Sequence, residues 1–148
     1  MTENLSFNDC ITDFETAYAT LITVAESYPD DLQTQAGVCG TWSARELIAH
    51  LCGWIVEALR RYPRYALSTG DIDYNTDAFN EVSIWLRREK GYDSIVSELR
   101  DSSAKLAQFA RDLPESQIER NGQRYMEWLT SLTREAREHS AQLKDFAS

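Results

Sequence analysis

The sequence predicts an all-α protein folded as a bundle of helices. Five segments carry apolar residues at the three- and four-residue spacing of a buried helix face, and no segment alternates as a strand does. A chain of 148 residues, 43% hydrophobic and 26% charged, has enough apolar surface for one core. We therefore expect residues 1–148 to form a single bundle domain in which four long helices pack together.

Two of the long helices are expected in the first half of the chain. The first spans about residues 7–28, with Ser6 as its N-cap and Pro29 at its end. The second starts at Ser43, because Ser43 and Glu46 have the spacing of a capping box, and it fades near residues 62–63.

Three further helices follow a connection over residues 63–75. A shorter helix is expected over about residues 76–90. The fourth helix starts after Asp93 and ends before Pro114, and the last spans about residues 123–146 after a polar loop. We expect the short helix to lie in the crossover between the second and third bundle helices.

The charge of the chain argues against a nucleic-acid partner. The net charge is -9, whereas proteins that bind nucleic acids are usually basic. One local basic group stands out, and we interpret it as a solvated surface, with binding of an anionic small molecule as the alternative. It comprises Arg60, Arg61, Arg64, Arg87, Arg88 and Lys90.

Cysteine usage and hydropathy predict a cytoplasmic protein with no membrane partner. Cys10, Cys39 and Cys52 are odd in number, have no C-x-x-C spacing and accompany no export signal, so we expect reduced thiols. The most apolar run, residues 47–59, is interrupted by His50 and Glu57 and is therefore expected to be a buried helix face.

The most informative chemical pattern is a possible metal site. Glu135 and His139 are four residues apart, so they lie on one face of the last helix and can reach one ion. His50, in the second helix, is the only other histidine of the chain. Two imidazoles and one carboxylate suit zinc, nickel or iron and leave positions open for water and substrate. The alternative is that each histidine is a hydrogen-bonded core residue.

Two other patterns are less specific. Residues 71–77 match the first ligand positions of a calcium loop, but Thr76 stands where that loop needs glycine, so a helix N-cap at Asn75 or Thr76 is the simpler interpretation. Four tryptophans are many for this length, and they either pack in the core or line a pocket for a planar or hydrophobic ligand.

Three segments resemble the DinB-like superfamily, and within it the ClbS/DfsB branch of colibactin self-protection proteins. They are residues 42–54 (WSARELIAHLCGW), 73–80 (DYNTDAFN) and 135–143 (EAREHSAQL). The resemblance implies an up-down-down-up four-helix bundle with a long crossover, often dimeric, and a pocket at one end. Metal-binding members use one histidine from the second helix and a His-x-x-x-His pair from the last. By position these ligands are His50, Glu135 and His139, with Glu135 replacing the first histidine of the pair.

The resemblance also has implications for the function of the protein. It implies an enzyme, a hydrolase or transferase, that acts on a small electrophilic or xenobiotic molecule with a divalent metal held by His50, Glu135 and His139. Trp42, Trp54 and Trp128 would help to line its pocket. A second hypothesis is a metal-independent cyclopropane hydrolase like the self-protection branch, with His50 or Glu135 as general acid or base. A third is a module that sequesters a small molecule without turnover. In each case a homodimer is expected.

Overall fold

The computed structural model describes residues 6–64 and 72–148, and within these ranges it contains helices and no strand. The four long helices are α1 (Phe7–Glu26), α2 (Ala44–Arg61), α4 (Tyr92–Arg111) and α5 (Glu115–Ala147). A shorter helix, α3 (Thr76–Leu86), and two 3-10 turns, η1 (Asp30–Leu32) and η2 (Tyr62–Arg64), complete the described elements. The predicted all-α four-helix bundle, with an extra helix in the crossover, is confirmed.

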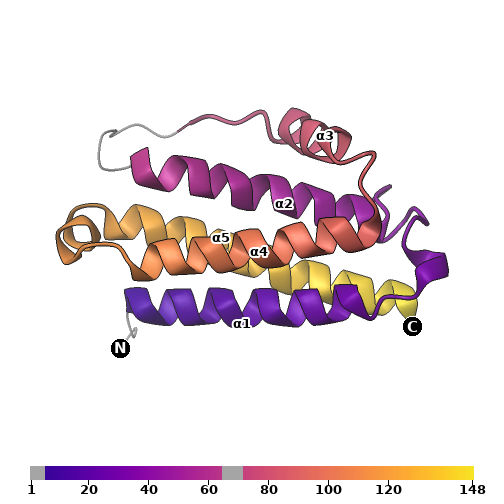
Figure 1. Ribbon diagram of the computed structural model, residues 1–148, viewed down its shortest axis with the longest axis horizontal. Helices are drawn as coiled ribbons and strands as arrows, with labels where there is room; N and C mark the ends of the chain where they lie inside the picture. The colour runs from indigo at the N-terminus through magenta and orange to yellow at the C-terminus, as the bar shows by residue number, and fades with distance from the viewer. Residues whose placement is uncertain (1–5, 65–71) are drawn as a thin grey trace.

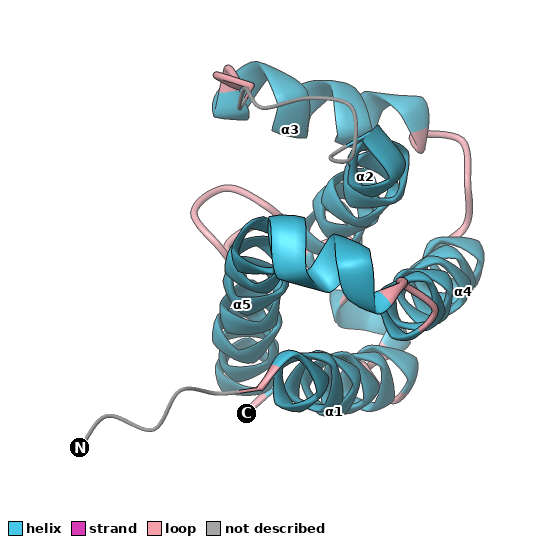
Figure 2. Ribbon diagram, turned by 90° about the vertical axis from the view of Figure 1, so that its left-hand side faces the viewer, coloured by secondary structure: helices cyan, strands magenta, loops and turns pink. Residues whose placement is uncertain are grey.

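The four long helices surround one apolar core. In Figure 1, α1 and α5 run in one direction along the bundle and α2 and α4 in the other, which is the up-down-down-up order expected. The view in Figure 2 shows α2 and α1 on opposite sides of the bundle, with α4 and α5 between them. Helix α3 lies outside the bundle against α2. The core is therefore shared by α1, α2, α4 and α5, with α3 as a cover on one helix.

Capping residues set the helix starts that the sequence predicted. Ser6 and Ser43 each accept a hydrogen bond from the third helical residue, whose acidic side chain bonds back to the backbone of the cap. Asn75 caps α3 through a hydrogen bond from the Ala78 amide.

The last helix begins earlier than its apolar pattern indicates. Helix α5 starts at Glu115, directly after Pro114, so the predicted polar loop before residue 123 is wrong. The first turns of α5 are mostly exposed and carry few apolar residues, yet they contain no proline and have a side-chain bond between Asn121 and Gln117, one turn apart. The polar residues before residue 123 therefore belong to an exposed part of the helix and not to a loop.

Helix α3 ends earlier than expected, at Leu86 instead of Lys90. Arg87 turns back so that its guanidinium bonds Glu98 of α4 at 2.6 and 3.0 Å, and Lys90 reaches the same carboxylate at 3.0 Å. Arg45 of α2 donates to the backbone carbonyls of Arg87 and Lys90. Charged contacts of this kind are strong when partly buried, and they join the start of α2 to the junction between α3 and α4.

One close approach fixes α3 on α2. A Cβ atom at Gly53 would lie 2.0 Å from the Ser83 Oγ atom and 2.5 Å from the Ser83 Cβ atom. The absence of a side chain at Gly53 therefore lets α3 pack directly on the α2 backbone. Beside it, Trp54 stacks on Phe79 with ring centroids 4.1 Å apart, and its indole N–H donates to the Asn80 side chain at 2.7 Å.

The sequence predicted that the apolar run over residues 47–59 is a buried helix face and does not cross a membrane. None of the helices in the described parts of the chain is both long enough and apolar enough to span a membrane.

We predict that Gly53→Ala loosens α3. Alanine favours a helix by about 1 kcal/mol over glycine, but a forced overlap with Ser83 costs about 1–3 kcal/mol, so the net effect is destabilising. Chemical denaturation measures the free energy of unfolding. Gly122→Ala is the matched control, because Gly122 also lies inside a helix and a Cβ atom there would meet only the Ile118 side chain, at 3.4 Å. Adding Ser83→Gly to Gly53→Ala should recover part of the loss, and equal stability of wild type and Gly53→Ala would contradict the packing described.

Candidate metal centre

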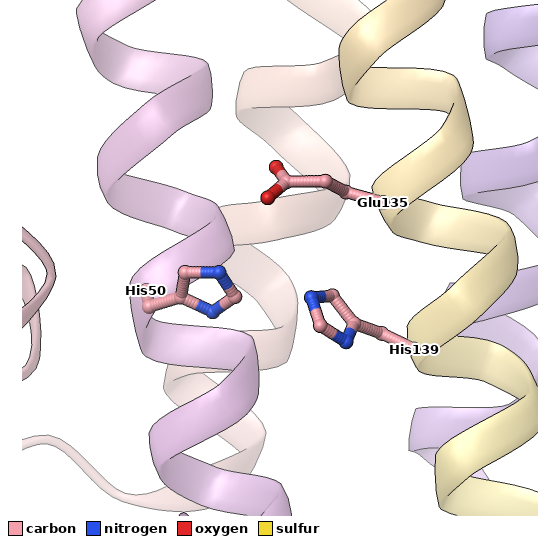
Figure 3. A group of neighbouring side chains, drawn as sticks. All are labelled: His50, Glu135 and His139. Atoms are coloured by element: carbon pink, nitrogen blue, oxygen red, sulfur yellow. The ribbon is translucent and has the colours of Figure 1, made fainter. Parts of the chain in front are cut away.

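Three side chains meet between α2 and α5, one from α2 and two, four residues apart, from α5. Figure 3 shows His50 of α2 facing Glu135 and His139 of α5. Each residue offers one ligand atom, and these atoms all lie within 4.8 Å of one another. The two imidazole rings are nearly perpendicular, with centroids 5.2 Å apart. The set predicted from sequence spacing is thus brought together by the fold.

The orientation of His50 is fixed by its own helix and by one aromatic neighbour. Its Nδ1 atom lies 2.7 Å from the Leu47 carbonyl oxygen, which can only accept, so Nδ1 carries the proton and donates. The lone pair is left on Nε2. The Trp42 ring packs on the imidazole with centroids 4.6 Å apart. His50 is therefore held as a neutral tautomer with one nitrogen available as a ligand.

His139 is held in the same way from α5. Its Nδ1 atom lies 2.7 Å from the Gln142 Oε1 atom, three residues further along the helix. An amide oxygen accepts a hydrogen bond, so this contact also places the proton on Nδ1 and the lone pair on Nε2. Both histidines are buried, 3% and 7% exposed. Such hydrogen bonds from the second ring nitrogen are a regular feature of metal-ligating histidines.

Burial shifts the pKa of each of the three groups in the direction that disfavours its charged form. Burial lowers the pKa of His50 to about 4, and burial also lowers the pKa of His139. Burial, followed by the nearby Glu138 carboxylate, raises the pKa of Glu135. The shared cause is desolvation of the charged forms. Near neutral pH both imidazoles are unprotonated, which is the form that binds a metal.

A fourth polar group lies within electrostatic reach of this cluster. Tyr18 of α1 is 1% exposed, and its hydroxyl has no hydrogen-bond partner among the described residues. Burial raises the pKa of Tyr18, and the negative charge of Glu135 raises it further. A buried hydroxyl without a partner costs about 1–3 kcal/mol. The Tyr18 hydroxyl is therefore an unsatisfied donor among the described residues, with an electrostatic influence of Glu135 on it.

A cavity of ≈ 440 Å³ opens beside Glu135. Trp54, Tyr74 and Trp128 contribute aromatic walls, and the ring centroids of Trp54 and Tyr74 are 5.2 Å apart. Glu135 is the one member of the His-Glu-His cluster among the residues that line it. The carboxylate thus belongs both to the candidate metal centre and to the cavity, whose size is typical of a small-molecule site.

The three tryptophans expected at the pocket have different places. Trp54 and Trp128 line the cavity, whereas Trp42 is outside its lining and packs on His50 instead. A turn positions Trp42, in which its amide donates to the Cys39 carbonyl at 2.9 Å and Gly40 adopts a positive φ of 57°. The role of Trp42 suggested by its position is to cover a candidate ligand.

Sequence reasoning did not identify two arginines as lining residues of the cavity, although Arg61 was named in the basic group. Arg61 and Arg124 line the cavity together with the aromatic walls. Arg61 follows His50 by eleven residues, and Arg124 precedes Glu135 by eleven, which is three turns along the same helix face. That spacing was a usable signal. Tyr18 gave none, because an apolar stripe that includes tyrosine predicts core packing equally well.

Most described residues of the basic group make structural contacts, and the calcium-loop pattern includes the N-cap of α3. Within the basic group, Arg60 pairs with Glu57, Arg87 and Lys90 pair with Glu98, and Arg88 lies over the Trp85 ring. Of the calcium-loop pattern, Asp71 lies outside the described residues, and Asn75 serves as the N-cap of α3. No described residue of that segment belongs to a cluster of potential metal ligands.

Comparisons with known proteins agree with the fold. The sequence pattern of the mycothiol maleylpyruvate isomerase N-terminal domain matches residues 14–146. The crystal structure of the colibactin self-resistance protein ClbS in complex with a dsDNA superimposes with a TM-score of 0.80, at 14% identity, over 97% of this chain and 96% of that one. An uncharacterised protein from Escherichia coli UTI89 gives a TM-score of 0.76, at 14% identity, over 97% and 94%. No curated protein matches the sequence significantly. The family match confirms the resemblance to the DinB-like superfamily, and the likeness to ClbS, at 14% identity, shows a shared fold.

One expectation is corrected by these comparisons. The acidic net charge was taken to exclude a nucleic-acid partner, yet the colibactin self-resistance protein, which has this fold, is seen in complex with a dsDNA. The exclusion is therefore wrong. Net charge sums over the whole chain, whereas binding depends on the local field of one surface.

We predict that the metal-free protein loses stability on acidification because of His50. The pKa of a histidine is ordinarily 6.5, and burial lowers it to about 4 for His50 in the fold, so between these pH values the unfolded chain binds more protons and stability falls as pH falls. The full effect is about 3 kcal/mol. Denaturation in chelator at pH 4–7 should give a shallower slope for His50→Leu than for wild type. Glu135, with a raised pKa, contributes with the opposite sign and cancels in this comparison. Equal slopes would contradict the prediction.

Proposed function

This chain belongs to the family of mycothiol maleylpyruvate isomerase N-terminal domains, and we propose that it is a metal-dependent enzyme acting on a small electrophilic molecule. One observation carries the proposal: His50, Glu135 and His139 converge beside a cavity with aromatic walls. Zinc, nickel or iron is the metal class proposed, because two imidazole nitrogens and one carboxylate oxygen suit these ions. The reaction class is hydrolysis or group transfer.

The residues present fit such an ion. Both histidines offer Nε2 lone pairs because each Nδ1 is already used as a donor, and burial keeps the rings neutral. Glu135 supplies a negative charge that no described cation neutralises through an ion pair. The unsatisfied Tyr18 hydroxyl supplies a donor nearby. A divalent cation would compensate the buried carboxylate and explain why these groups are placed together.

Each residue of the site has a task in this proposal. A divalent ion, when bound, supplies a Lewis acid that polarises a substrate or lowers the pKa of water. Glu135 would be the third ligand, and because it also borders the cavity it would hold the ion next to the substrate. Trp54 and Trp128 orient the substrate and reduce the water around it. His50 and His139 are ligands held rigid by Leu47 and Gln142.

A second candidate function uses the same site without a metal. The resemblance to the self-protection branch implies this alternative, in which His50 or Glu135 acts as general acid or base for attack of water on a strained ring. Turnover of a model cyclopropane or epoxide, followed by mass spectrometry, separates the alternatives. Metal-dependent turnover stops in chelator and returns with added ion, whereas metal-independent turnover continues in chelator and is lost in Glu135→Gln. A tight stoichiometric complex without product would indicate a sequestering module.

The partners of the protein are open to direct measurement. The likeness to a DNA-bound structure makes double-stranded DNA a candidate partner, although most of the basic group is engaged by Glu57, Glu98 and Trp85. Binding of a labelled duplex at two salt concentrations tests it. The homodimer implied by the family resemblance stays a prediction that light scattering can check.

We predict that the untagged protein binds one zinc, nickel or iron ion per chain. Removal of a ligand should abolish binding in His139→Ala and weaken it about 100-fold in Glu135→Gln, because a carboxylate ligand is lost with little change of shape. Elemental analysis and calorimetry measure both. Glu119→Gln, an exposed glutamate of α5 outside the cluster, is the control. A wild-type protein that takes up none of these ions would refute the metal-dependent proposal.

We predict that Tyr18→Phe separates metal binding from stability. Loss of an unsatisfied hydroxyl should leave the metal-free protein at least as stable, whereas zinc affinity should fall about tenfold when the donor near Glu135 is lost. Tyr28→Phe is a matched control, since Tyr28 is also buried with an unpartnered hydroxyl but is not coupled to the cluster. Equal zinc affinity in wild type and Tyr18→Phe would count against a role for this hydroxyl.

A further inference from the structure

The cavity has a cationic end that the proposed metal chemistry does not use. Arg61, at the last position of α2, and Arg124 of α5 both line it. Each is eleven residues from a member of the His-Glu-His cluster on its own helix, which is roughly 16 Å along the axis. Helices α2 and α5 run in opposite directions and contact one another, so both arginines lie toward the same end of the bundle. The cavity therefore has the cluster's Glu135 at one end and arginines at the other.

Arg61 is poorly satisfied within the protein. Its Nε atom is buried and has no hydrogen-bond partner among the described residues. The acid one turn away, Glu57, is already occupied: Arg60 donates to both of its oxygens at 2.8 Å, and the Tyr74 hydroxyl donates at 2.5 Å. Arg61 acts on Glu57 only through its field. A buried guanidinium N–H without an acceptor is costly, and an anionic ligand would supply that acceptor.

The acids that line the cavity do not occupy Arg61. Glu127 is exposed and accepts a hydrogen bond from Gln123 at 3.0 Å. Glu135 is placed at the His-Glu-His cluster, three turns from Arg124. Neither forms an ion pair with Arg61 among the described residues.

The walls between the two ends suit a flat apolar body. The Trp54 ring is nearly perpendicular to Tyr74, and Tyr74 is nearly perpendicular to Trp128, with centroids 5.2 and 6.4 Å apart. Leu132 and Ile72 add aliphatic surface. The volume of ≈ 440 Å³ is at the lower end of the range for drug-sized ligands.

We propose that the cavity binds an elongated, largely apolar or aromatic carboxylate, whose carboxylate pairs with Arg61 while its other end lies at Glu135. The planar guanidinium matches a carboxylate in geometry as well as in charge. This inference rests on the proposed function for the reacting end of the ligand. It adds the substrate class: an electrophile that carries an acidic group remote from the reacting atoms.

The test compares two probes that differ only in charge. 4-(Pyren-1-yl)butanoate and its neutral amide are titrated into the full chain in chelator, and binding is followed by fluorescence anisotropy. Wild type should bind the anion about tenfold more tightly than the amide. Arg61→Gln should remove this preference. Arg61→Lys should retain part of it, because lysine keeps the positive charge but lacks the planar guanidinium with its paired N–H donors. Arg120→Gln, an exposed arginine of α5 outside the cavity, removes the same charge and should change nothing.

The outcomes separate this inference from the metal proposal. Because the probes are measured in chelator and zinc affinity is measured independently on the same variants, Arg61→Gln should bind zinc as wild type does. Equal binding of anion and amide by wild type would overturn the inference, as would equal losses in Arg61→Gln and Arg120→Gln. Displacement of the bound probe by an unlabelled DNA duplex would also overturn it, because the anion at Arg61 would then be a nucleic-acid phosphate.

Discussion

The site depends on one constraint: two buried imidazoles and a half-buried carboxylate face one another between α2 and α5. Apolar packing of the four long helices sets the separation of these helices, and short local hydrogen bonds to Leu47 and Gln142 set the rotation of each ring. Desolvation then makes the charged forms of the histidines unfavourable, so both nitrogens that face the cluster present lone pairs. Burying this cluster of polar side chains lowers the stability of the fold unless a ligand binds there, because buried polar atoms without partners destabilise a core.

Glu135 connects the two parts of the site. The same carboxylate belongs to the cluster and lines the cavity, whereas the histidines lie behind it. A ligand in the cavity would meet this oxygen before either imidazole. The aromatic walls and the arginines extend from it along α2 and α5, because both helices repeat a face every three to four residues. The chemistry proposed at one end and the recognition proposed at the other are therefore consequences of the same pair of antiparallel helices.

Local sequence signals located most of the helices, and their failures have physical causes. Ser43 and Glu46 marked the start of α2 because a capping box is a contact between residues three apart. The start of α5 was placed too late because its first turns are exposed and lack an apolar stripe. The end of α3 was placed too late because Arg87 is drawn to Glu98 of the next helix, a contact that no local pattern contains. The net charge led to a wrong exclusion of nucleic-acid partners for a similar reason, since a sum over the chain carries no information about where the charges lie.

The sequence by itself determined the fold class, the face of each long helix and the pairing of Glu135 with His139, because these depend on residues within one or two turns. It also contained the three-turn spacing from His50 to Arg61, which periodicity alone could have shown. Only the tertiary structure decided that His50 lies opposite Glu135 and that Trp42 covers the imidazole instead of lining the cavity. It also decided that the Tyr18 hydroxyl has no hydrogen-bond partner among the described residues. Each of these depends on how separate helices approach and rotate, which is set by packing across the whole core and not by any local spacing.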